Sequence, residues 1–359
     1  MRFVSPALKR FVYPTLAATG YLRYCARRGE LCVLTYHGVR PAGYVSRDEA
    51  LDGGLVSAEN LRAQLRLLKR RYHVITPQQF HLWILHQESL PPLSILLTCD
   101  DGLLNVLSDM LPILQEEGVQ CLFFITGVSA GADRAMLWYE ELYLLLQSAP
   151  EGSIEIELGN FQAACGGTEN RRNFWWNLVR MLSARDAEFR VRILEMLHQK
   201  IESASDCIAK LQSNDGNFRR FFLLNRNEVQ ALAQAGMTIG AHTMHHPRLS
   251  QCSDECAHAE ILGSRNELQS AVGQAVWALA YPFGDAGSIT GRELALAKSA
   301  NFDCAFTNVG GGFGADLPTF ALPRVHVTAD MNLAEFEAHV SGFYRSLHRA
   351  ANPVAGQSA

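Results

Sequence analysis

The 359-residue sequence lacks a strong excess of charge of either sign, since 19% of its residues are charged and the formal net charge is −4. Nucleic-acid binding needs concentrated positive charge, which this composition does not offer. The sequence also lacks any run approaching the roughly 18 apolar residues that a membrane-spanning helix needs. With 48% hydrophobic residues, the chain is predicted to be a globular protein with a substantial core and no nucleic-acid partner.

The nine cysteines lack the regular spacing of a disulfide framework, and several lie within apolar runs. We interpret them as small buried side chains in a reducing compartment. Cys252 and Cys256 are spaced to share a helix face, and with His258 nearby they could in principle hold zinc. No second pair stands close by in the sequence, so packing is the preferred interpretation.

Residues 1–30 resemble a secretory signal only poorly, because Pro14, Thr15 and Gly20 interrupt a weakly apolar stretch after a basic start. We interpret this segment as an amphipathic lead-in helix that packs on the domain, with reversible peripheral contact with a membrane as the alternative. The expected location is cytoplasmic, including the inner face of the membrane.

Short apolar or β-branched runs recur along the chain, each followed by a helical pattern or a loop. Seven such runs are Leu31–Tyr36, Tyr72–Thr76, Ile95–Cys99, Cys121–Thr126, Met237–Ala241, Val276–Tyr281 and Cys304–Thr307. Strands that alternate with helices indicate a parallel sheet, and continuous apolar strands indicate burial on both faces. The predicted fold is a closed or nearly closed α/β barrel over residues 31–330, followed by a helical segment and a tail in residues 331–359.

The stretch from about residue 130 to residue 226 breaks this rhythm, because it is longer than one crossover needs and is rich in charge and tryptophan. We predict a helical insertion in the barrel. Its aromatic side chains could stack on a sugar ring, but anchorage of the insertion to the core is the preferred interpretation. These aromatic residues are Trp138, Tyr139, Trp175 and Trp176.

Two adjacent carboxylates, Asp100 and Asp101, follow the apolar run that ends at Cys99. Site-forming loops of α/β folds begin at the carboxyl ends of parallel strands. Gly102 comes next, and glycine lets the backbone turn both carboxylates toward one centre, where one could bind a metal while the other handles a proton. The alternative is that one of them caps the helix that begins near Leu103.

Three histidines, His242, His245 and His246, follow the run that ends at Ala241. Histidines four residues apart converge on one metal if the segment turns through about one helical turn, and neutral imidazole is a preferred zinc ligand. His242, His246 and one carboxylate would leave positions open for water and substrate, as a catalytic site requires. His245 points elsewhere on such a turn.

Three motifs together resemble those of the polysaccharide deacetylases, carbohydrate esterases related to chitin and peptidoglycan deacetylases. They are Thr-Cys-Asp-Asp-Gly at 98–102, His-Thr-Met-His-His-Pro at 242–247 and Tyr-Pro-Phe-Gly at 281–284. With Leu-Thr-Tyr-His-Gly-Val at 34–39 and Leu-Pro-Arg-Val at 322–325, the resemblance extends over about residues 31–327. It implies a distorted (β/α) barrel of about seven parallel strands.

The resemblance also implies roles for individual residues. It assigns the metal to Asp101, His242 and His246. It implies that Asp100 is the general base. Two histidines compete for the role of general acid: His37, which relatives with an early Tyr-His motif place beside the metal, and His326, near a late histidine motif of many relatives. We prefer His37.

Two positions depart from the family pattern. Cys99 replaces a usual phenylalanine, a tolerable change of one buried apolar group for a smaller one. Ala280 stands where many relatives have an arginine that orients the base, and we expect Arg324 to supply that charge and keep Asp100 ionised. A surface salt bridge is the alternative role of Arg324. The motif Tyr281, Pro282, Phe283 and Gly284 is expected to shape the substrate pocket through its turn and an exposed Phe283.

The predicted function is metal-dependent removal of N-acetyl groups from an amino sugar or glycan. The divalent metal is expected to be zinc, with cobalt, nickel and manganese as alternatives for this ligand set. A small-amide amidase on the same fold and a non-catalytic carbohydrate-binding relic are the competing functions. Asp100 argues against the relic, because a passive metal site does not need it. The sequence predicts no oligomeric state.

Overall fold

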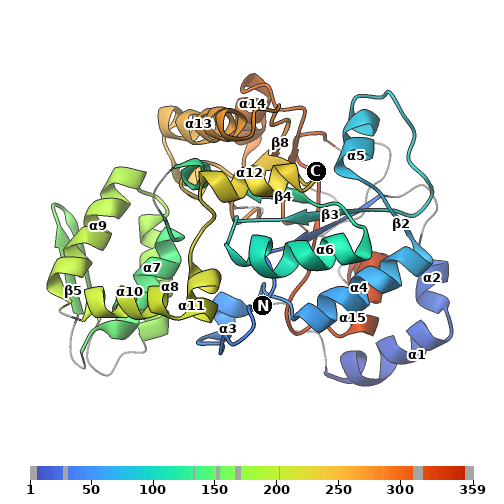
Figure 1. The fold of residues 1–359 in the computed structure, drawn as a ribbon, viewed down its shortest axis with the longest axis horizontal. Helices are drawn as coiled ribbons and strands as arrows, with labels where there is room; N and C mark the ends of the chain where they lie inside the picture. The colour runs from blue at the N-terminus through green and yellow to red at the C-terminus, as the bar shows by residue number, and fades with distance from the viewer. Residues whose placement is uncertain are drawn as a thin grey trace.

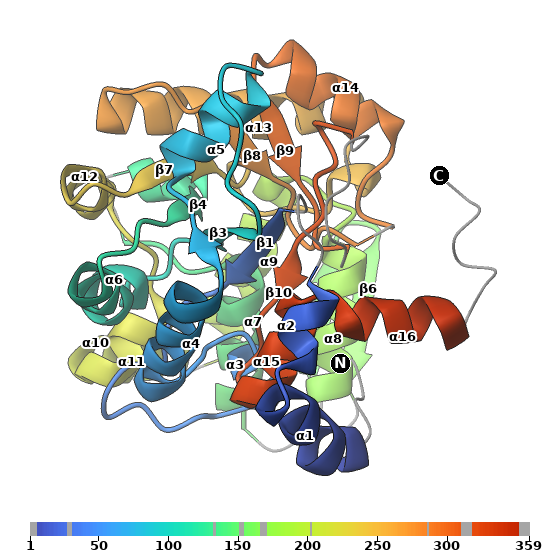
Figure 2. The same ribbon diagram turned by 90° about the vertical axis from the view of Figure 1, so that its right-hand side faces the viewer.

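The computed structural model describes residues 6–26, 31–131, 134–150, 154–165, 171–201, 203–285, 287–309 and 318–351. Its centre is a parallel sheet that curls into a distorted, partly open barrel surrounded by helices (Figures 1 and 2). The predicted α/β barrel of about seven parallel strands is confirmed. Parts of the predicted lead-in (residues 1–5 and 27–30) and of the C-terminal tail (residues 352–359) lie outside the described residues.

The barrel strands follow the order β10-β1-β3-β4-β7-β8-β9, with β2 paired to the first part of β3. Their bounds are β1 (Cys32–Tyr36), β2 (His73–Val74), β3 (Ser94–Cys99), β4 (Leu122–Ile125), β7 (Thr238–Ala241), β8 (Ala278–Ala280), β9 (Cys304–Phe306) and β10 (Val325–His326). Six of the seven predicted runs contain one of these strands, and the seventh, Ile95–Cys99, lies within β3, which begins one residue earlier. Among the barrel strands, β10 was missed, because its two residues directly follow Pro323 and Arg324 and belong to no longer apolar run. It narrows the gap in the barrel, because Leu322 bridges Phe306 while Val325 and His326 pair with β1.

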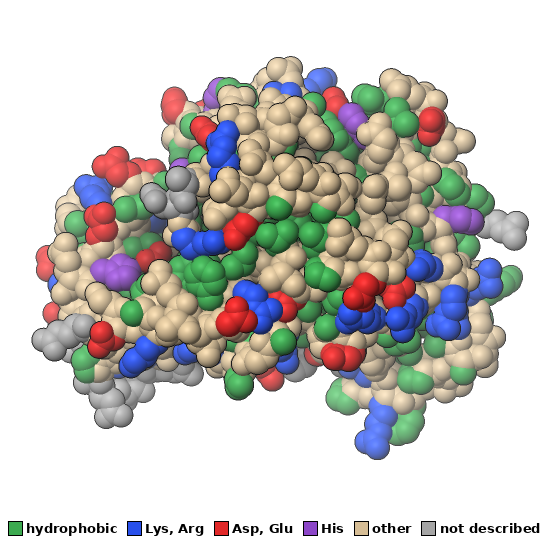
Figure 3. All heavy atoms as spheres, viewed as in Figure 1, with side chains coloured by type: hydrophobic (Ala, Val, Ile, Leu, Met, Phe, Trp, Pro, Cys, Tyr) green, Lys and Arg blue, Asp and Glu red, His purple; other side chains and the backbone are tan. Residues whose placement is uncertain are grey.

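Helices cover the outside of the sheet and fill the connections. Their bounds are η1 (Leu8–Val12), α1 (Tyr13–Ala18), α2 (Tyr21–Cys25), α3 (Glu49–Asp52), α4 (Ala58–Arg71), α5 (Pro77–Ile84), η2 (Val106–Met110), α6 (Leu111–Glu117), η3 (Gly127–Ala130), α12 (Arg226–Gln234), η4 (Leu249–Gln251), α13 (Asp254–Val272), α14 (Gly291–Ser299), α15 (Leu333–Val340) and α16 (Phe343–Ala351). Among the described residues, no helix is long and apolar enough to cross a membrane. Basic side chains gather over the end of the molecule that holds α1, α2 and α4 (Figure 3).

Apolar side chains on alternate strand positions fill the barrel interior. Val33, Leu96, Phe124, Ala280 and Phe306 belong to this inner cluster. Their sequence neighbours on the strands, such as the residues on either side of Leu96, pack outward against the helices. Because both faces of the sheet are buried, its strands are apolar throughout, which is why they stood out in the sequence.

The stretch between η3 and α12 forms a lobe beside the barrel (Figure 1). It contains α7 (Trp138–Ser148), α8 (Arg171–Leu182), α9 (Ala187–Lys200), α10 (Ala204–Ser213), α11 (Asp215–Phe221) and an antiparallel hairpin of β5 (Ile154–Leu158) and β6 (Phe161–Cys165). The lobe has its own apolar core around the buried Trp175. The hairpin was not expected from the sequence.

A buried ionic cluster fixes this lobe to the barrel. The guanidinium of Arg220 on α11 donates hydrogen bonds to Asp52 of α3 (2.7 Å) and to both carboxylate oxygens of Glu140 on α7 (3.0 and 2.9 Å). All three side chains are almost completely buried. Buried charges are tolerated when they are paired and hydrogen-bonded in this way. The cluster therefore holds the first turn of α7 in one place relative to the barrel loops.

Candidate active site

Polar side chains reach the mouth of the barrel because they continue the inward-facing positions of its strands. Side chains alternate along a strand, so every second residue faces the interior. On β3 this series runs from Leu96 through Thr98 to Asp100, which lies at the carboxyl end of the strand. The same counting places five further residues at the mouth: His37, His242, Asn308, Arg324 and His326.

Asp101 would face outward if β3 continued, but the backbone turns at this point. Asp101 and Gly102 both have left-handed conformations, with φ of 76° and 81°. A side chain at Gly102 would also press on Ile125, because a Cβ there would lie 2.9 Å from the Ile125 Cγ2 atom. The glycine thus permits the turn that brings Asp101 beside Asp100, as expected from the sequence.

Backbone strain is concentrated at this site. Seven non-glycine residues have positive φ among the described residues, and four of them are Asp101, Thr243, His246 and Phe283. Such conformations cost free energy and persist where the surrounding structure holds them, often at functional sites. This observation points to the same loops as the sequence motifs.

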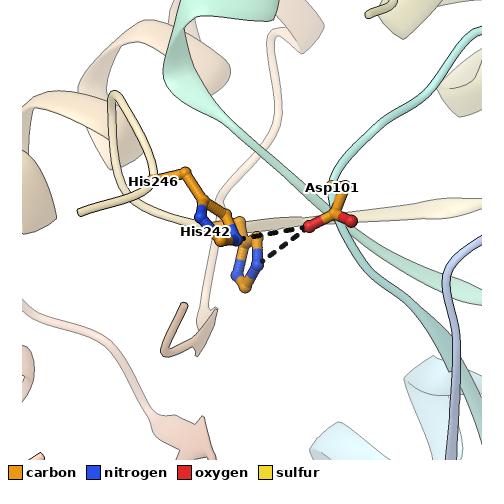
Figure 4. Close-up of side chains that lie close together, drawn as sticks. All are labelled: Asp101, His242 and His246. Carbon is orange, nitrogen blue, oxygen red and sulfur yellow. Dashed lines mark ion pairs between the residues drawn. The ribbon is translucent and has the colours of Figure 1, made fainter. Parts of the chain in front are cut away.

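Asp101, His242 and His246 converge at the carboxyl ends of β3 and β7 (Figure 4). One carboxylate oxygen of Asp101 lies 3.4 Å from Nε2 of His242 and 3.4 Å from Nε2 of His246. All three side chains are buried. They form the one group of three candidate metal ligands within mutual reach among the described residues, and Cys252 and Cys256 join no such group.

This donor set fits a divalent metal ion. Ligands about 2.0–2.1 Å from a zinc ion are separated by roughly 3.3–3.4 Å in tetrahedral geometry, which matches the 3.4 Å between the Asp101 oxygen and each imidazole nitrogen. Two imidazoles and one carboxylate also leave a coordination position for water or substrate. The arrangement therefore has the chemistry of a catalytic rather than a closed structural site.

Further contacts orient the two histidines. Nδ1 of His242 lies 2.7 Å from the carbonyl oxygen of Ala280, which directs Nε2 toward Asp101. The carbonyl oxygen of His246 accepts a hydrogen bond from Nε1 of Trp138 in the neighbouring lobe (3.2 Å). His245, between them, turns away and contacts Glu260 through Nδ1 (2.9 Å).

Asp100 forms a buried bidentate ion pair with Arg324. The two terminal nitrogens of the guanidinium each lie 2.6 Å from one carboxylate oxygen of Asp100, and both side chains are fully buried. The other N–H groups of Arg324 donate to the Thr98 hydroxyl, the Thr307 carbonyl and the Asn308 side chain, so that all five are used. Arg324 thus contacts Asp100 as the sequence suggested, and it does not lie in a surface salt bridge.

The electrostatic balance keeps both aspartates ionised. Burial is the largest single influence on Asp100 and by itself would raise its pKa, but the charge and hydrogen bonds of Arg324, together with His242 and His37, lower that pKa below the usual value. Burial also opposes ionisation of Asp101, yet hydrogen bonds from His242 and His246 hold its pKa well below the usual range. Burial dominates at His246 and lowers its pKa, which favours the neutral imidazole that binds metals.

Both candidate acids lie at the site, side by side. The rings of His37 and His326 have centroids 4.7 Å apart. His37 is close enough to Asp100 and Asp101 for its charge to lower the pKa of both carboxyls. Its buried Nδ1 atom has no hydrogen-bond partner among the described residues. His37 therefore lies close to the carboxylates and has a ring nitrogen without a hydrogen-bond partner among the described residues.

The motif at residues 281–284 contributes one side chain to the mouth of the barrel. Tyr281 is buried, and its hydroxyl donates to the carbonyl oxygen of Phe320 (3.0 Å), so it supports the turn from beneath. Pro282 is also buried. Phe283 is half-buried rather than exposed, and its ring packs at 5.0 Å from the ring of His246. Gly284 has φ of 63°, and a Cβ there would lie 2.5 Å from the Asn308 nitrogen.

Of the four aromatic residues that the sequence offered either as a sugar-stacking surface or as anchors of the insertion, Tyr139 is the one whose ring lies beside His246 and Phe283. Its ring lies 5.4 Å from the ring of His246 and 6.4 Å from that of Phe283. Burial and the nearby charge of Asp101 raise its pKa well above the usual value, so the phenol stays neutral. The neighbouring Trp138 anchors the lobe, whereas Trp176 is exposed on α8. The available signal was the aromatic pair Trp138-Tyr139 at the start of a helix, which does not reveal what the helix faces.

A family model for polysaccharide deacetylases matches residues 87–305, which is more than half of the chain. The matched range includes the two aspartates and the histidine motif, while His37, Arg324 and His326 lie outside it. A candidate polysaccharide deacetylase of Bacillus subtilis, YxkH, is 25% identical over 117 residues, which is 33% of this chain and 41% of that protein. The alignment thus spans less than half of this relative.

Three solved structures share the fold. The Streptococcus pyogenes deacetylase PplD in complex with acetate aligns with a TM-score of 0.55 and 16% identity, covering 88% of this chain and 99% of that chain. A de-N-acetylase from Aggregatibacter actinomycetemcomitans aligns with a TM-score of 0.53 and 15% identity, and the alignment covers 86% of this chain and 99% of that chain. A polysaccharide deacetylase from Bacillus cereus aligns with a TM-score of 0.52 and 16% identity, and the alignment covers 87% of this chain and 69% of that chain. At these identities, the likeness shows the fold alone.

The geometry of the three-residue cluster predicts the effect of removing one ligand. His246→Ala should weaken metal binding by at least about 100-fold, because loss of even an outer-shell partner costs about 10–100-fold. His245→Ala is the matched control, since His245 lies in the same loop but faces Glu260. Metal content and affinity can be measured by elemental analysis and titration. Full metal retention by His246→Ala, or equal loss in His245→Ala, would contradict the ligand assignment.

Proposed function

Because the chain belongs to the polysaccharide deacetylase family, we propose that it is a metal-dependent hydrolase that removes N-acetyl groups from an amino sugar or glycan. Enzymes of this family hydrolyse carbon–nitrogen bonds. The observation that carries the proposal is the convergence of two groups at one barrel mouth: the possible metal site and, beside it, the paired carboxylate of Asp100. Amide hydrolysis needs both, since a water must be activated and its proton accepted.

The metal site would be formed by Asp101, His242 and His246. A divalent ion held there would polarise the acyl carbonyl and acidify a water. We propose zinc, and the same donors also suit cobalt, nickel and manganese. The protein's part is to present two oriented imidazoles and an ionised carboxylate from strands that are fixed by the barrel.

Asp100 is proposed to accept the proton of the attacking water. Its two oxygens accept hydrogen bonds from Arg324, which leaves a lone pair on each for the water. The ion pair fixes the plane of the carboxylate and keeps it ionised, so that it can act as a base at neutral pH. Arg324 is thus proposed to position the base.

His37 is proposed to protonate the departing amine. It lies close to both aspartates, and its Nδ1 atom has no hydrogen-bond partner among the described residues, so the imidazole is not committed to a structural hydrogen bond through that atom. His326 packs against the His37 ring and is the alternative acid.

The substrate side of the site is proposed to include Tyr139 and Phe283. Both rings pack beside His246, and together they form an aromatic wall contributed by the lobe and by the loop after β8. Aromatic faces suit the apolar faces of sugar rings. The proposed role of Tyr139 is to contact the sugar that carries the acyl group.

Acetate release is the direct test of this function. The metal-loaded protein should release acetate from N-acetylglucosamine oligomers, and Asp100→Asn should reduce turnover by about 10² or more while keeping the metal. The asparagine preserves shape but cannot accept the proton. Release from small non-glycan amides alone would favour the amidase, and no release from any N-acetylated sugar would contradict the proposal. Near-native turnover by Asp100→Asn would remove the base assignment.

The two histidines can be distinguished by the leaving group. His37→Ala should reduce turnover of an N-acetyl sugar by about 10² or more, and spare an acetyl ester of a good leaving group that needs no proton. His326→Ala should cause a smaller loss that is the same for both substrates. If His326→Ala instead showed the selective loss, the acid would be His326.

Tyr139 can be tested by separating binding from turnover. Tyr139→Ala should raise KM for an N-acetylglucosamine oligomer about three- to tenfold, the scale of one aromatic contact, with little change in kcat or metal content. Tyr139→Phe should retain most of the affinity if ring contact dominates. Trp176→Ala, an exposed aromatic on α8, is the control. Unchanged KM in Tyr139→Ala would show that the ring does not contact the substrate.

A further inference from the structure

The N-terminal helices present an outer face that is apolar and basic. Tyr24, Phe11 and Tyr21 are 86%, 64% and 46% exposed, although large aromatic side chains are usually buried. Arg10 and Arg23 are exposed on the same helices. The described part of this segment, residues 6–26, contains no aspartate or glutamate.

The inner face of these helices is packed, so the outer face has a defined position. Tyr13 and Leu22 are completely buried against Ala338 of α15. The Lys9 ammonium pairs with Asp330 at 2.5 Å and with Glu335 at 3.2 Å. One side of the amphipathic segment therefore packs on the domain. The aromatic residues on its other side do not pack into the hydrophobic core and are exposed.

The exposed face continues onto the last helix. The Tyr21 ring lies 6.0 Å from the ring of Phe343 on α16 and 6.4 Å from that of Tyr24. Leu347 of α16 is 39% exposed. Figure 2 shows α1, α2 and α16 gathered at one end of the molecule. We call this the terminal face; it consists of Arg10, Phe11, Val12, Tyr21, Arg23, Tyr24 and Leu347.

The end of the molecule that carries the terminal face is basic, whereas the whole protein has a negative net charge. Residues 6–26 carry Lys9, Arg10 and Arg23 and no acidic side chain, whereas the complete chain has a net charge of −4. Residues 341–347 add Arg345 and no acidic residue, and the nearby Asp330 and Glu335 are paired with Lys9. An anionic surface would attract this end and repel the remainder, so it would orient the molecule with the terminal face toward it.

We propose that the terminal face docks on a bilayer surface that contains anionic lipids. Tyrosine and phenylalanine insert at the level of lipid headgroups, and arginine pairs with lipid phosphates. The terminal face exposes these residue types together and contains no carboxylate, and the nearby Asp330 is paired with Lys9. The proposal concerns a surface that shares no residue with the candidate active site, so it stands or falls independently of the proposed function.

Vesicle binding by the full-length protein tests the proposal. The protein should bind vesicles that contain phosphatidylglycerol more tightly than vesicles of phosphatidylcholine alone, and less tightly as salt rises. Arg10→Glu with Arg23→Glu should weaken this binding by about 30-fold or more, since each basic residue near such a surface contributes about fivefold and charge reversal adds repulsion. Phe11→Ser with Tyr24→Ser should weaken binding to both kinds of vesicle by about tenfold or more.

The matched control is Trp176→Ser with Arg180→Glu, an exposed aromatic and an exposed arginine on α8 in the lobe. This control should bind like the unmodified protein, and thermal unfolding should show that all variants are folded. The proposal is overturned if the protein does not prefer anionic vesicles, or if the control loses as much binding as the terminal-face variants. It is also overturned if sedimentation shows a dimer that the terminal-face variants alone dissociate, because the face would then be covered by a second copy of the chain.

Discussion

The buried ion pair between Asp100 and Arg324 is the interaction around which the barrel mouth is organised. It joins the end of β3 to the segment that closes the barrel before β10, across the apolar interior. A buried arginine is tolerated only when its donors are satisfied, and here Thr98, Thr307 and Asn308 complete the set. The guanidinium also lies over the rings of Phe124 and Phe306, at 5.4 and 5.9 Å from their centroids. The pair thus forms the boundary between the apolar interior below and the polar site above.

The alternation of side chains along the strands explains why the site could be anticipated. A period of two assigns Asp100 and His242 to the same interior as the apolar residues that precede them on their strands. The residue types and spacing of the two motifs then indicate two histidines and one of the two aspartates, and the family resemblance assigns the carboxylate to Asp101. The structure brings the ligand atoms of these three residues within 4.8 Å of one another. The strands themselves were predictable because burial on both faces makes them continuously apolar.

Contacts between distant segments were not predictable in the same way. Trp138 donates a hydrogen bond to His246, and Arg220 pairs with Asp52 and Glu140. These partners lie 80 to 168 positions apart in the sequence, and no local sequence pattern predicts such contacts. The β5–β6 hairpin was missed because its strands alternate apolar and polar residues within a segment that is rich in charged residues throughout, so they did not stand out as apolar runs. Tyr281 was expected in the pocket, yet the structure buries its ring, because the chain is still in the layer of β8 at that residue.

The central claim is that Asp101, His242 and His246 hold a metal beside an unligated Asp100. Anomalous diffraction from crystals of the metal-loaded protein, recorded at the absorption edge of the bound metal, tests it most directly. The account predicts one strong peak bonded to the Asp101 carboxylate and to Nε2 of both histidines, with the Asp100 carboxylate still paired with Arg324 and outside bonding distance. A peak at another site, or one bonded to Asp100, would contradict it.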